Sequence, residues 1–369
     1  MSGADSLPAV VTVGALLLGI VFGAVGQRVN FCTMGAVSDV ATFGDWRRMR
    51  MWVLAIVVAI AGVALLQTAG LIDVAKSIYT GPRVAWLSML VGGFLFGFGM
   101  ALASGYGSRT LIRIGGGNLK SLIVLVFIGI SAYMTLKGVF VVWRATALDP
   151  VRIDVGAATS DLPAVLVKVG LPAAARAWVP WVVVGPIAAW IFANRAFRTT
   201  REMIVGGVVI GAVIVAGWYL SGHVGHLAED PATLEEKFVA TNSGRMESFS
   251  FVAPVAYLLE LLVYWTDTSR VLTFGIAGVL GMVVGAAAMA LATRTFRWEG
   301  FTTTEDLVHH IAGGILMGFG GVTALGCTIG QGITGLSTLA IGSFLAFFSI
   351  VGGCLAALKY QTWRVERSG

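Results

Sequence analysis

The chain has 369 residues, of which 57% are hydrophobic and only 12% charged, and its mean hydropathy is +0.87. Soluble domains carry about 25% charged residues, so this composition excludes a soluble globular protein and indicates an all-α integral membrane protein. The net charge of +6 comes from basic residues in short connections, with no basic patch of interleaved aromatic residues. We therefore expect contact with membrane lipid and no nucleic-acid partner.

Nine apolar runs are long enough to cross a bilayer, for which about 20 residues are needed. A tenth run, 250–265, is shorter and contains Pro254 and Glu260, and we interpret it as a re-entrant or interfacial helix. No basic segment or clear small-residue cleavage site accompanies the first run, which favours a retained helix. The nine predicted spans are 8–25, 51–70, 84–103, 121–142, 178–193, 204–221, 271–292, 308–325 and 337–358.

Basic residues follow every second predicted span, whereas the connection after the sixth span is mainly acidic. Because basic connections stay in the cytoplasm, we expect a multi-pass protein of the bacterial inner membrane with its N-terminus outside and its C-terminus in the cytoplasm. The basic connections contain Arg47, Arg48 and Arg50; Arg109, Arg113 and Lys120; Arg195, Arg198 and Arg201; Arg294 and Arg297; and Lys359, Arg364 and Arg367.

A ten-residue pattern occurs twice, at 97–106 and again 221 residues later at 318–327, with three glycines, a phenylalanine and an alanine in register. The predicted orientation makes the two copies enter the membrane from opposite sides, which is typical of transporters with an inverted pseudo-two-fold repeat. We expect one polytopic domain, 1–369. Its predicted parts are a first repeat half, 1–143, a second repeat half, 271–369, and outer-face inserts at 144–177 and 222–249.

Short polar, glycine-rich segments follow the first, third and eighth spans, at 31–41, 108–120 and 328–336. Each is too polar for a full span and too apolar for a solvated loop, so we expect half-helices that dip toward the midplane. A half-helix N-terminus inside a bundle carries partial positive charge and unpaired N–H groups, and it suits an anion. The alternative is that the glycines only permit close helix packing. The glycines concerned are Gly105, Gly107, Gly326 and Gly330.

The three cysteines have no CxxC spacing, so neither a disulfide framework nor a metal site is indicated, and we expect no cofactor. Cys32 and Cys327 lie where apolar helix gives way to polar backbone, whereas Cys354 lies inside the ninth span and fits a packing role. A thiol at such a break can donate a weak hydrogen bond to a soft anion. The four histidines form no metal pattern and fit interfacial positions.

Three stretches carry a resemblance to the YeeE/YedE family of sulfur-compound membrane transporters, and the match covers nearly the whole chain. They are Asn30-Phe31-Cys32-Thr33-Met34-Gly35, the stretch from Arg109 to Ser121, and the stretch from Leu316 to Gly332 with its Gly326-Cys327-Thr328-Ile329-Gly330-Gln331-Gly332 end. The resemblance implies an hourglass of nine spanning helices with short helices from both faces. It also implies a cysteine-lined centre that passes thiosulfate by S–H hydrogen bonds, and a small cytosolic TusA-like sulfur carrier as partner.

This sequence departs from the family pattern at one position. The family usually has Gly-Cys-Gly before Arg109, where this chain has Gly105-Tyr106-Gly107. The hydroxyl of Tyr106 can donate a hydrogen bond, but the ring is bulky and cannot exchange with sulfur. Two interpretations of Lys120 and Arg109 are open. Either their charges attract the anion, or the side chains have a purely interfacial, inside-positive role. The predicted substrate path consists of Cys32, Tyr106, Cys327, Gly105, Gly107, Gly326, Gly330, Gln331, Asn118, Lys120 and Arg109.

Three hypotheses follow from these observations. The first is transport of a small sulfur-containing anion, thiosulfate or a relative, by a protein that is not an enzyme. The second is covalent sulfur transfer through Cys32 or Cys327, which normally needs a nearby base, and neither cysteine motif contains a histidine. The third is a general inorganic-anion channel that uses only the helix ends.

Overall fold

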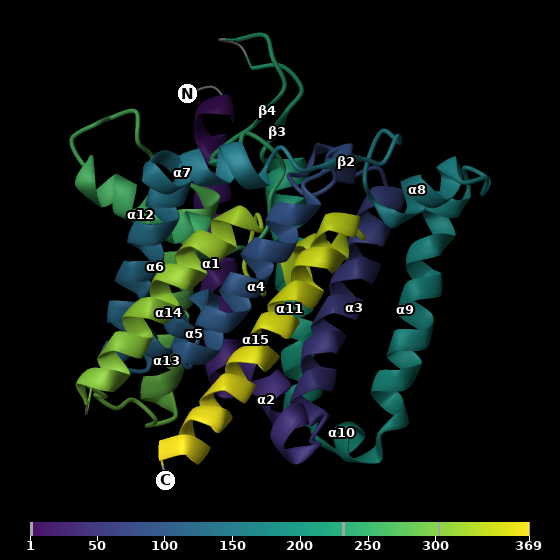
Figure 1. Cartoon of the computed structure of the whole chain (residues 1–369). Coiled ribbons are helices and arrows are strands. Elements are labelled where there is room, and N and C mark those ends of the chain that lie inside the picture. The colour runs from purple at the N-terminus through teal and green to yellow at the C-terminus, as the bar shows by residue number, and fades with distance from the viewer. Residues whose placement is uncertain (1–2, 231–232, 302, 369) are drawn as a thin grey trace.

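The structure is a computed structural model that describes residues 3–230, 233–301 and 303–368, and helices dominate it (Figure 1). The helices of the first half are α1 (Gly3–Arg28), α2 (Thr33–Phe43), α3 (Arg47–Thr68), η1 (Val74–Lys76), α4 (Trp86–Leu102), α5 (Gly107–Gly115), α6 (Leu119–Lys137), α7 (Val139–Trp143), η2 (Arg144–Leu148) and α8 (Leu162–Lys168). Those of the second half are α9 (Ala175–Ala193), α10 (Arg195–Thr199), α11 (Arg201–Tyr219), η3 (Leu220–Val224), α12 (Ala253–Val263), α13 (Phe274–Ala292), α14 (Thr304–Thr323), η4 (Gly330–Gly335) and α15 (Ile341–Ser368).

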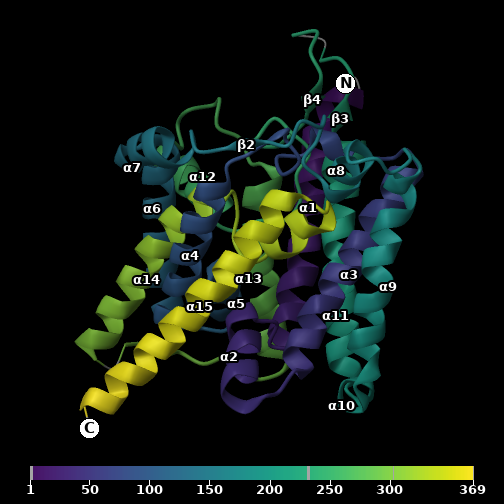
Figure 2. The same ribbon diagram turned by 45° about the vertical axis from the view of Figure 1, so that its right-hand side comes forward.

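Two short antiparallel strand pairs cover one end of the bundle. β1 (Arg83–Val84) pairs with β2 (Ile153–Asp154), and β3 (His226–Leu227) pairs with β4 (Lys237–Phe238). Figures 1 and 2 place these strands, α7, α8, α12 and the N-terminus at one end, and the C-terminus with α2 and α10 at the other. We call these ends the N-terminal face and the C-terminal face.

Among the described residues, eight helical segments are long and apolar enough to cross a membrane, which confirms an all-α membrane protein. They agree with eight of the nine predicted spans. The remaining predicted span, 308–325, forms most of α14, whose first turns carry Glu305, Asp306, His309 and His310 and are therefore less apolar. The eight segments are Ser6–Phe43, Arg47–Thr68, Trp86–Gly115, Leu119–Lys137, Ala175–Ala193, Arg201–Val224, Phe274–Ala292 and Ile341–Arg364.

Element boundaries differ from the sequence prediction at several places, and two of these differences have a local backbone cause. The predicted span 121–142 ends at Lys137, because Gly138 takes an extended conformation (φ −108°, ψ −154°) that separates α6 from α7. The last span begins at Ile341 and not at 337, because the chain first makes a turn through Leu339, which has a left-handed φ of 56°. The 250–265 segment forms the eleven-residue α12, too short to cross a bilayer.

The helices that carry the repeated motif cross each other at paired glycines. A Cβ on Gly92 would lie 2.7 Å from the carbonyl oxygen of Gly320, and one on Gly99 would lie 2.6 Å from that of Gly313. The contacts run in opposite chain directions, so α4 and α14 are antiparallel. Gly97 of α4 instead approaches Ile350 of α15, in parallel packing. Close backbone approach of this kind is the usual use of small residues between membrane helices.

We expect Gly97→Ala to destabilise the fold, since its Cβ would lie 1.9 Å from the carbonyl oxygen of Ile350. The helices α4 and α15 would have to separate, at a cost of about 1–3 kcal/mol for an overpacked site. Gly352→Ala is the matched control, because no atom lies within 4 Å of its added Cβ. Thermal unfolding in detergent should show a lower Tm for Gly97→Ala and an unchanged or higher Tm for Gly352→Ala. Equal Tm values would contradict the close packing.

Candidate functional site

Three helices that precede the predicted half-helices end in the same way, and α13 ends so as well, at Arg294 with a φ of 55°. After α1, α4 and α14, the chain passes through Asn30, Ser104 and Leu325, which have φ values of 51°, 50° and 56°. Non-glycine residues rarely adopt this left-handed conformation, and such strain is concentrated at functional sites. The amide of the following residue bonds to a carbonyl five residues earlier in each case: Phe31 to Gly26, Gly105 to Met100 and Gly326 to Gly321.

A cysteine or a tyrosine follows each left-handed residue by two positions: Cys32, Tyr106 and Cys327. Cys32 is the N-cap of α2, and its Sγ accepts a hydrogen bond from the Gly35 amide at 3.3 Å. The Sγ of Cys327 accepts from the Gly330 amide at 3.4 Å, with the same spacing of three residues. Since each sulfur accepts from the backbone, its S–H remains available to donate to a solute. Both thiols thus mark the beginning of a half-helix.

Tyr106 is the N-cap of α5, but its side chain makes no capping bond there. Its hydroxyl oxygen accepts a hydrogen bond from the Thr33 amide at 2.9 Å and lies 3.2 Å from the Thr33 Oγ1. The phenol therefore lies across the first turn of α2, beside Cys32, where an anion would otherwise meet the free N–H groups. The side chain is fully buried.

The chain segment before α12 contacts both halves of the predicted path, which the sequence did not indicate. The Ser250 hydroxyl and the Phe251 amide lie against the Cys327 thiol. The carbonyl oxygen of Phe251 lies 3.1 Å from where a Cβ on Gly107 would be, directly after Tyr106. The Oγ of Ser250 lies 2.6 Å from where a Cβ on Gly330 would be. The glycines at these two predicted positions thus permit the segment to approach closely.

A cluster of buried aromatic rings lies between the Cys32 and Cys327 ends of the path. Phe22 of α1 contacts Phe31 in an edge-on arrangement at 6.4 Å between ring centroids, and it contacts Phe251 at 5.6 Å. Phe249 stacks on Phe251 at 6.0 Å. Because Phe31 precedes Cys32 and Phe251 contacts Cys327, this apolar cluster connects the surroundings of the two thiols.

A cavity of about 220 Å³ opens beside Cys327 on the N-terminal face, and we call it the vestibule. Gly326 and Ser250, the neighbours of the thiol, form part of its lining. The side chains of Arg144 and Glu247 also line it. A second cavity of about 260 Å³ shares Arg144 with the vestibule and is lined by further arginines, Arg83 and Arg152. On this face an anion meets one guanidinium group in the vestibule, that of Arg144, which is paired with Asp149, and further arginines in the second cavity.

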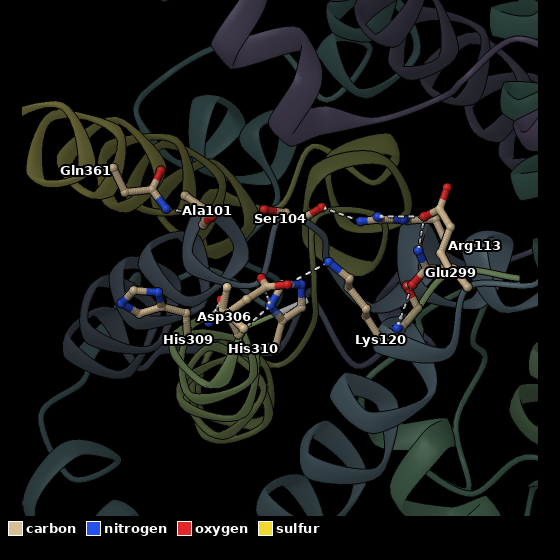
Figure 3. A network of polar contacts seen from close by, with 12 residues as sticks. Ala101, Ser104, Arg113, Lys120, Glu299, Asp306, His309, His310 and Gln361 are labelled. Atoms are coloured by element: carbon tan, nitrogen blue, oxygen red, sulfur yellow. Dashed lines mark hydrogen bonds and ion pairs between the residues drawn. The ribbon is translucent and has the colours of Figure 1, made fainter. Parts of the chain in front are cut away.

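On the C-terminal face, predicted path residues form a polar network with residues from distant parts of the chain (Figure 3). Lys120 Nζ pairs with Asp306 Oδ2 at 2.6 Å, and Asn118 hydrogen-bonds Glu299 and caps α6 through the Ser121 amide. These partners satisfy both side chains in this conformation. A role of Lys120 or Asn118 in contact with the anion therefore stays a prediction.

Arg109 and Gln331 hold the broken segments in place. The Nη2 of Arg109 lies 3.4 Å from Asn30 Oδ1 and so connects α5 to the turn before Cys32, and its Nη1 is buried without a hydrogen-bond partner among the described residues. The amide of Gln331 donates to the Ala324 carbonyl in the turn before Cys327.

Cys354 is fully buried within α15 and caps no half-helix. No cluster of residues that could hold a metal occurs in the described parts of the chain.

A bundle of apolar helices, with broken helices whose half-helix N-termini meet inside it, is the architecture of a membrane transport protein. The chain belongs to the sulphur transport family, whose model matches residues 28–356. It is 27% identical to the thiosulfate transporter TsuA of Spirochaeta thermophila over 349 residues, which cover 91% of this chain and 95% of the relative. It is 28% identical to the thiosulfate transporter TsuA of Escherichia coli K12 over 341 residues, covering 86% and 85%. Both relatives are transporters and not enzymes, in agreement with the prediction made for this chain.

Proposed function

We propose that the protein carries thiosulfate, or a closely related sulfur anion, across the inner membrane through the line of capped half-helices. The observation that carries this proposal is the threefold recurrence of one geometry, a left-handed residue followed two positions later by Cys32, Tyr106 or Cys327. Each break offers a donor side chain beside a helix N-terminus, which is the combination that a soft anion requires. The names of the two relatives support thiosulfate as the substrate.

The path begins in the vestibule, where the anion exchanges water for contacts with Arg144, Ser250 and the Cys327 thiol. It then passes the aromatic cluster and reaches the first turn of α2, where the Tyr106 phenol has to move aside. Cys32 and the Thr33 amide receive the anion there. Arg109 and Arg113 on α5 attract it onward to the C-terminal face. In this reading the thiols act by hydrogen bonding and form no covalent sulfur intermediate.

The helix pairing supports an inverted repeat of 1–143 and 271–369. The run α4–α5–α6 corresponds to α14–η4–α15, since α4 packs in parallel on α15 just as α14 packs in parallel on α6. In this proposal the N-terminal face is outside and carries the inserts 144–177 and 222–249. The basic C-terminal face is then cytoplasmic, where a TusA-like sulfur carrier would receive the anion.

Growth on thiosulfate tests this function in a cell. Bacteria that lack their own sulfate and thiosulfate uptake and express this chain should grow with thiosulfate as the sole sulfur source. The same cells carrying an empty vector should not grow, and both strains should grow on cysteine. Absence of growth on thiosulfate, with the protein present in the membrane fraction, would contradict the proposal.

A further inference from the structure

The vestibule contains a carboxylate where an anion has to bind. Glu247 lies outside the spanning helices, in the segment between β4 and α12, and its side chain is half-buried. It lines the same cavity as Ser250 and Gly326, the residues next to the Cys327 thiol. An anion that reaches Cys327 from the N-terminal face therefore passes close to the Glu247 carboxylate.

Glu247 has no salt-bridge partner among the described residues. Its Oε2 accepts a hydrogen bond from Ser243 at 3.0 Å, and the Asn242 backbone contributes another. The guanidinium group that lines the cavity, that of Arg144, is paired with Asp149 at 3.1 Å. When Glu247 is ionised, the vestibule thus contains one guanidinium group, which is already paired with Asp149, and one carboxylate without a salt-bridge partner among the described residues.

Among the ionisable groups that face this cavity, Glu247 is the one that titrates near neutral pH. Tyr79 faces it from the segment before β1, Tyr257 from α12 and Arg144 from η2, and Cys327 lies behind the lining, next to Gly326 and beside Tyr79. Phenols and guanidinium groups ordinarily titrate near or above pH 10. Burial raises the pKa of Glu247 to about 7, and the hydrogen bonds from Ser243 and Asn242 only partly oppose this.

A dianion and an ionised carboxylate in one small cavity repel each other, and burying both beside a single shared cation is unfavourable. Protonation of the carboxylate removes this repulsion and leaves the Arg144 charge to the anion. Binding of an anion must then stabilise the protonated form of Glu247, because the two equilibria are linked.

We propose that Glu247 takes up a proton when the sulfur anion binds in the vestibule, so that anion and proton enter the path together. This inference rests on the proposed function and deepens it. The proton comes from the solution on the N-terminal face and adds to one carboxylate oxygen, giving the neutral carboxyl group, and no other bond changes. When the anion moves past Cys327, the proton affinity of Glu247 falls again.

The pH dependence has a definite sign. Below about pH 7 the carboxyl group is already protonated, and anion affinity is at its highest. Above that pH the free site must first gain a proton, so affinity should fall roughly tenfold for each pH unit. Thiosulfate itself does not titrate in this range, so the change reports the protein. An acidic outer solution would therefore promote loading of the path.

Titration calorimetry of the purified full-length chain in detergent tests the proposal, with sodium thiosulfate as the probe. Binding heats measured near pH 8 in two buffers of different ionisation enthalpy give the number of protons taken up. Wild type should take up close to one proton per anion. Glu247→Gln should take up none and, at that pH, should bind roughly tenfold more tightly than wild type. Glu235→Gln, an exposed outer-face control outside the vestibule, should behave as wild type.

Each outcome distinguishes the two proposals. Thiosulfate binding by wild type without proton uptake would overturn the role of Glu247 and leave the proposed function standing, as would undiminished proton uptake by Glu247→Gln. No binding of thiosulfate by any variant, from about pH 6 to pH 8, would overturn the proposed function and this inference with it. Should Glu247→Gln fail to fold, the buffer dependence of wild type alone still decides.

Discussion

Cys327→Ala is expected to lower the rate of thiosulfate uptake by roughly 10- to 100-fold, which corresponds to the loss of one hydrogen bond to a charged group. The Cys327 thiol is fully buried next to Gly326 and Ser250 of the vestibule lining, and its sulfur accepts from the Gly330 amide at 3.4 Å. Its S–H is therefore the donor that an entering anion meets before the aromatic cluster. Uptake into proteoliposomes of equal protein content measures the effect.

Cys354→Ala is the matched control for this prediction. Cys354 is another fully buried cysteine, but it lies within α15 and opens no half-helix. Its loss should cost some packing energy and leave uptake close to wild type. If Cys327→Ala is as active as Cys354→Ala, the thiol has no role, and a channel that uses only helix ends would explain the structure better. A persulfide trapped on Cys327 would instead favour covalent sulfur transfer.

Tyr106→Cys is expected to raise the rate of thiosulfate uptake, by about tenfold if movement of the phenol limits the passage of the anion. In the structure the Tyr106 hydroxyl accepts a hydrogen bond from the Thr33 amide at 2.9 Å and so lies at the N-terminal turn of α2. A cysteine would be too short to reach that amide, so the helix N-terminus beside Cys32 becomes free for the anion. Comparison of initial uptake rates measures this change.

Tyr106→Phe separates bulk from hydrogen bonding. The ring remains, but the buried Thr33 amide loses its acceptor, at a cost of about 1–3 kcal/mol in stability. We expect Tyr106→Phe to unfold at a lower temperature than wild type and to show no gain in uptake. A gain as large as that of Tyr106→Cys would mean that the hydroxyl, and not the ring, restrains the anion. A fall in uptake for Tyr106→Cys would mean that the phenol is itself a required donor.

The sequence predicted the spans and the helix breaks because both have local causes. Apolar length fixes a span, and a glycine-rich, polar stretch after a span indicates a broken helix, so α2, α5 and η4 lie close to their predicted ranges. The recurring left-handed residue could not be predicted, since Asn30, Ser104 and Leu325 share no side-chain property. Their common geometry comes from the backbone.

The contacts that complete the candidate site depend on residues far apart in the chain. Ser250 belongs to a segment of mixed polarity, and only folding brings it to Cys327. The pairing of Lys120 with Asp306, 186 positions away, also depends on tertiary structure and could not be predicted. The orientation of the Tyr106 phenol toward α2 likewise depends on tertiary packing.

The most direct test of the account is the uptake of labelled thiosulfate into proteoliposomes that contain only this protein. The account predicts saturable uptake by wild type above protein-free vesicles, faster uptake by Tyr106→Cys and a strong loss in Cys327→Ala. Absence of uptake by both wild type and Tyr106→Cys, in vesicles where the protein is folded, would contradict transport of thiosulfate along the capped half-helices.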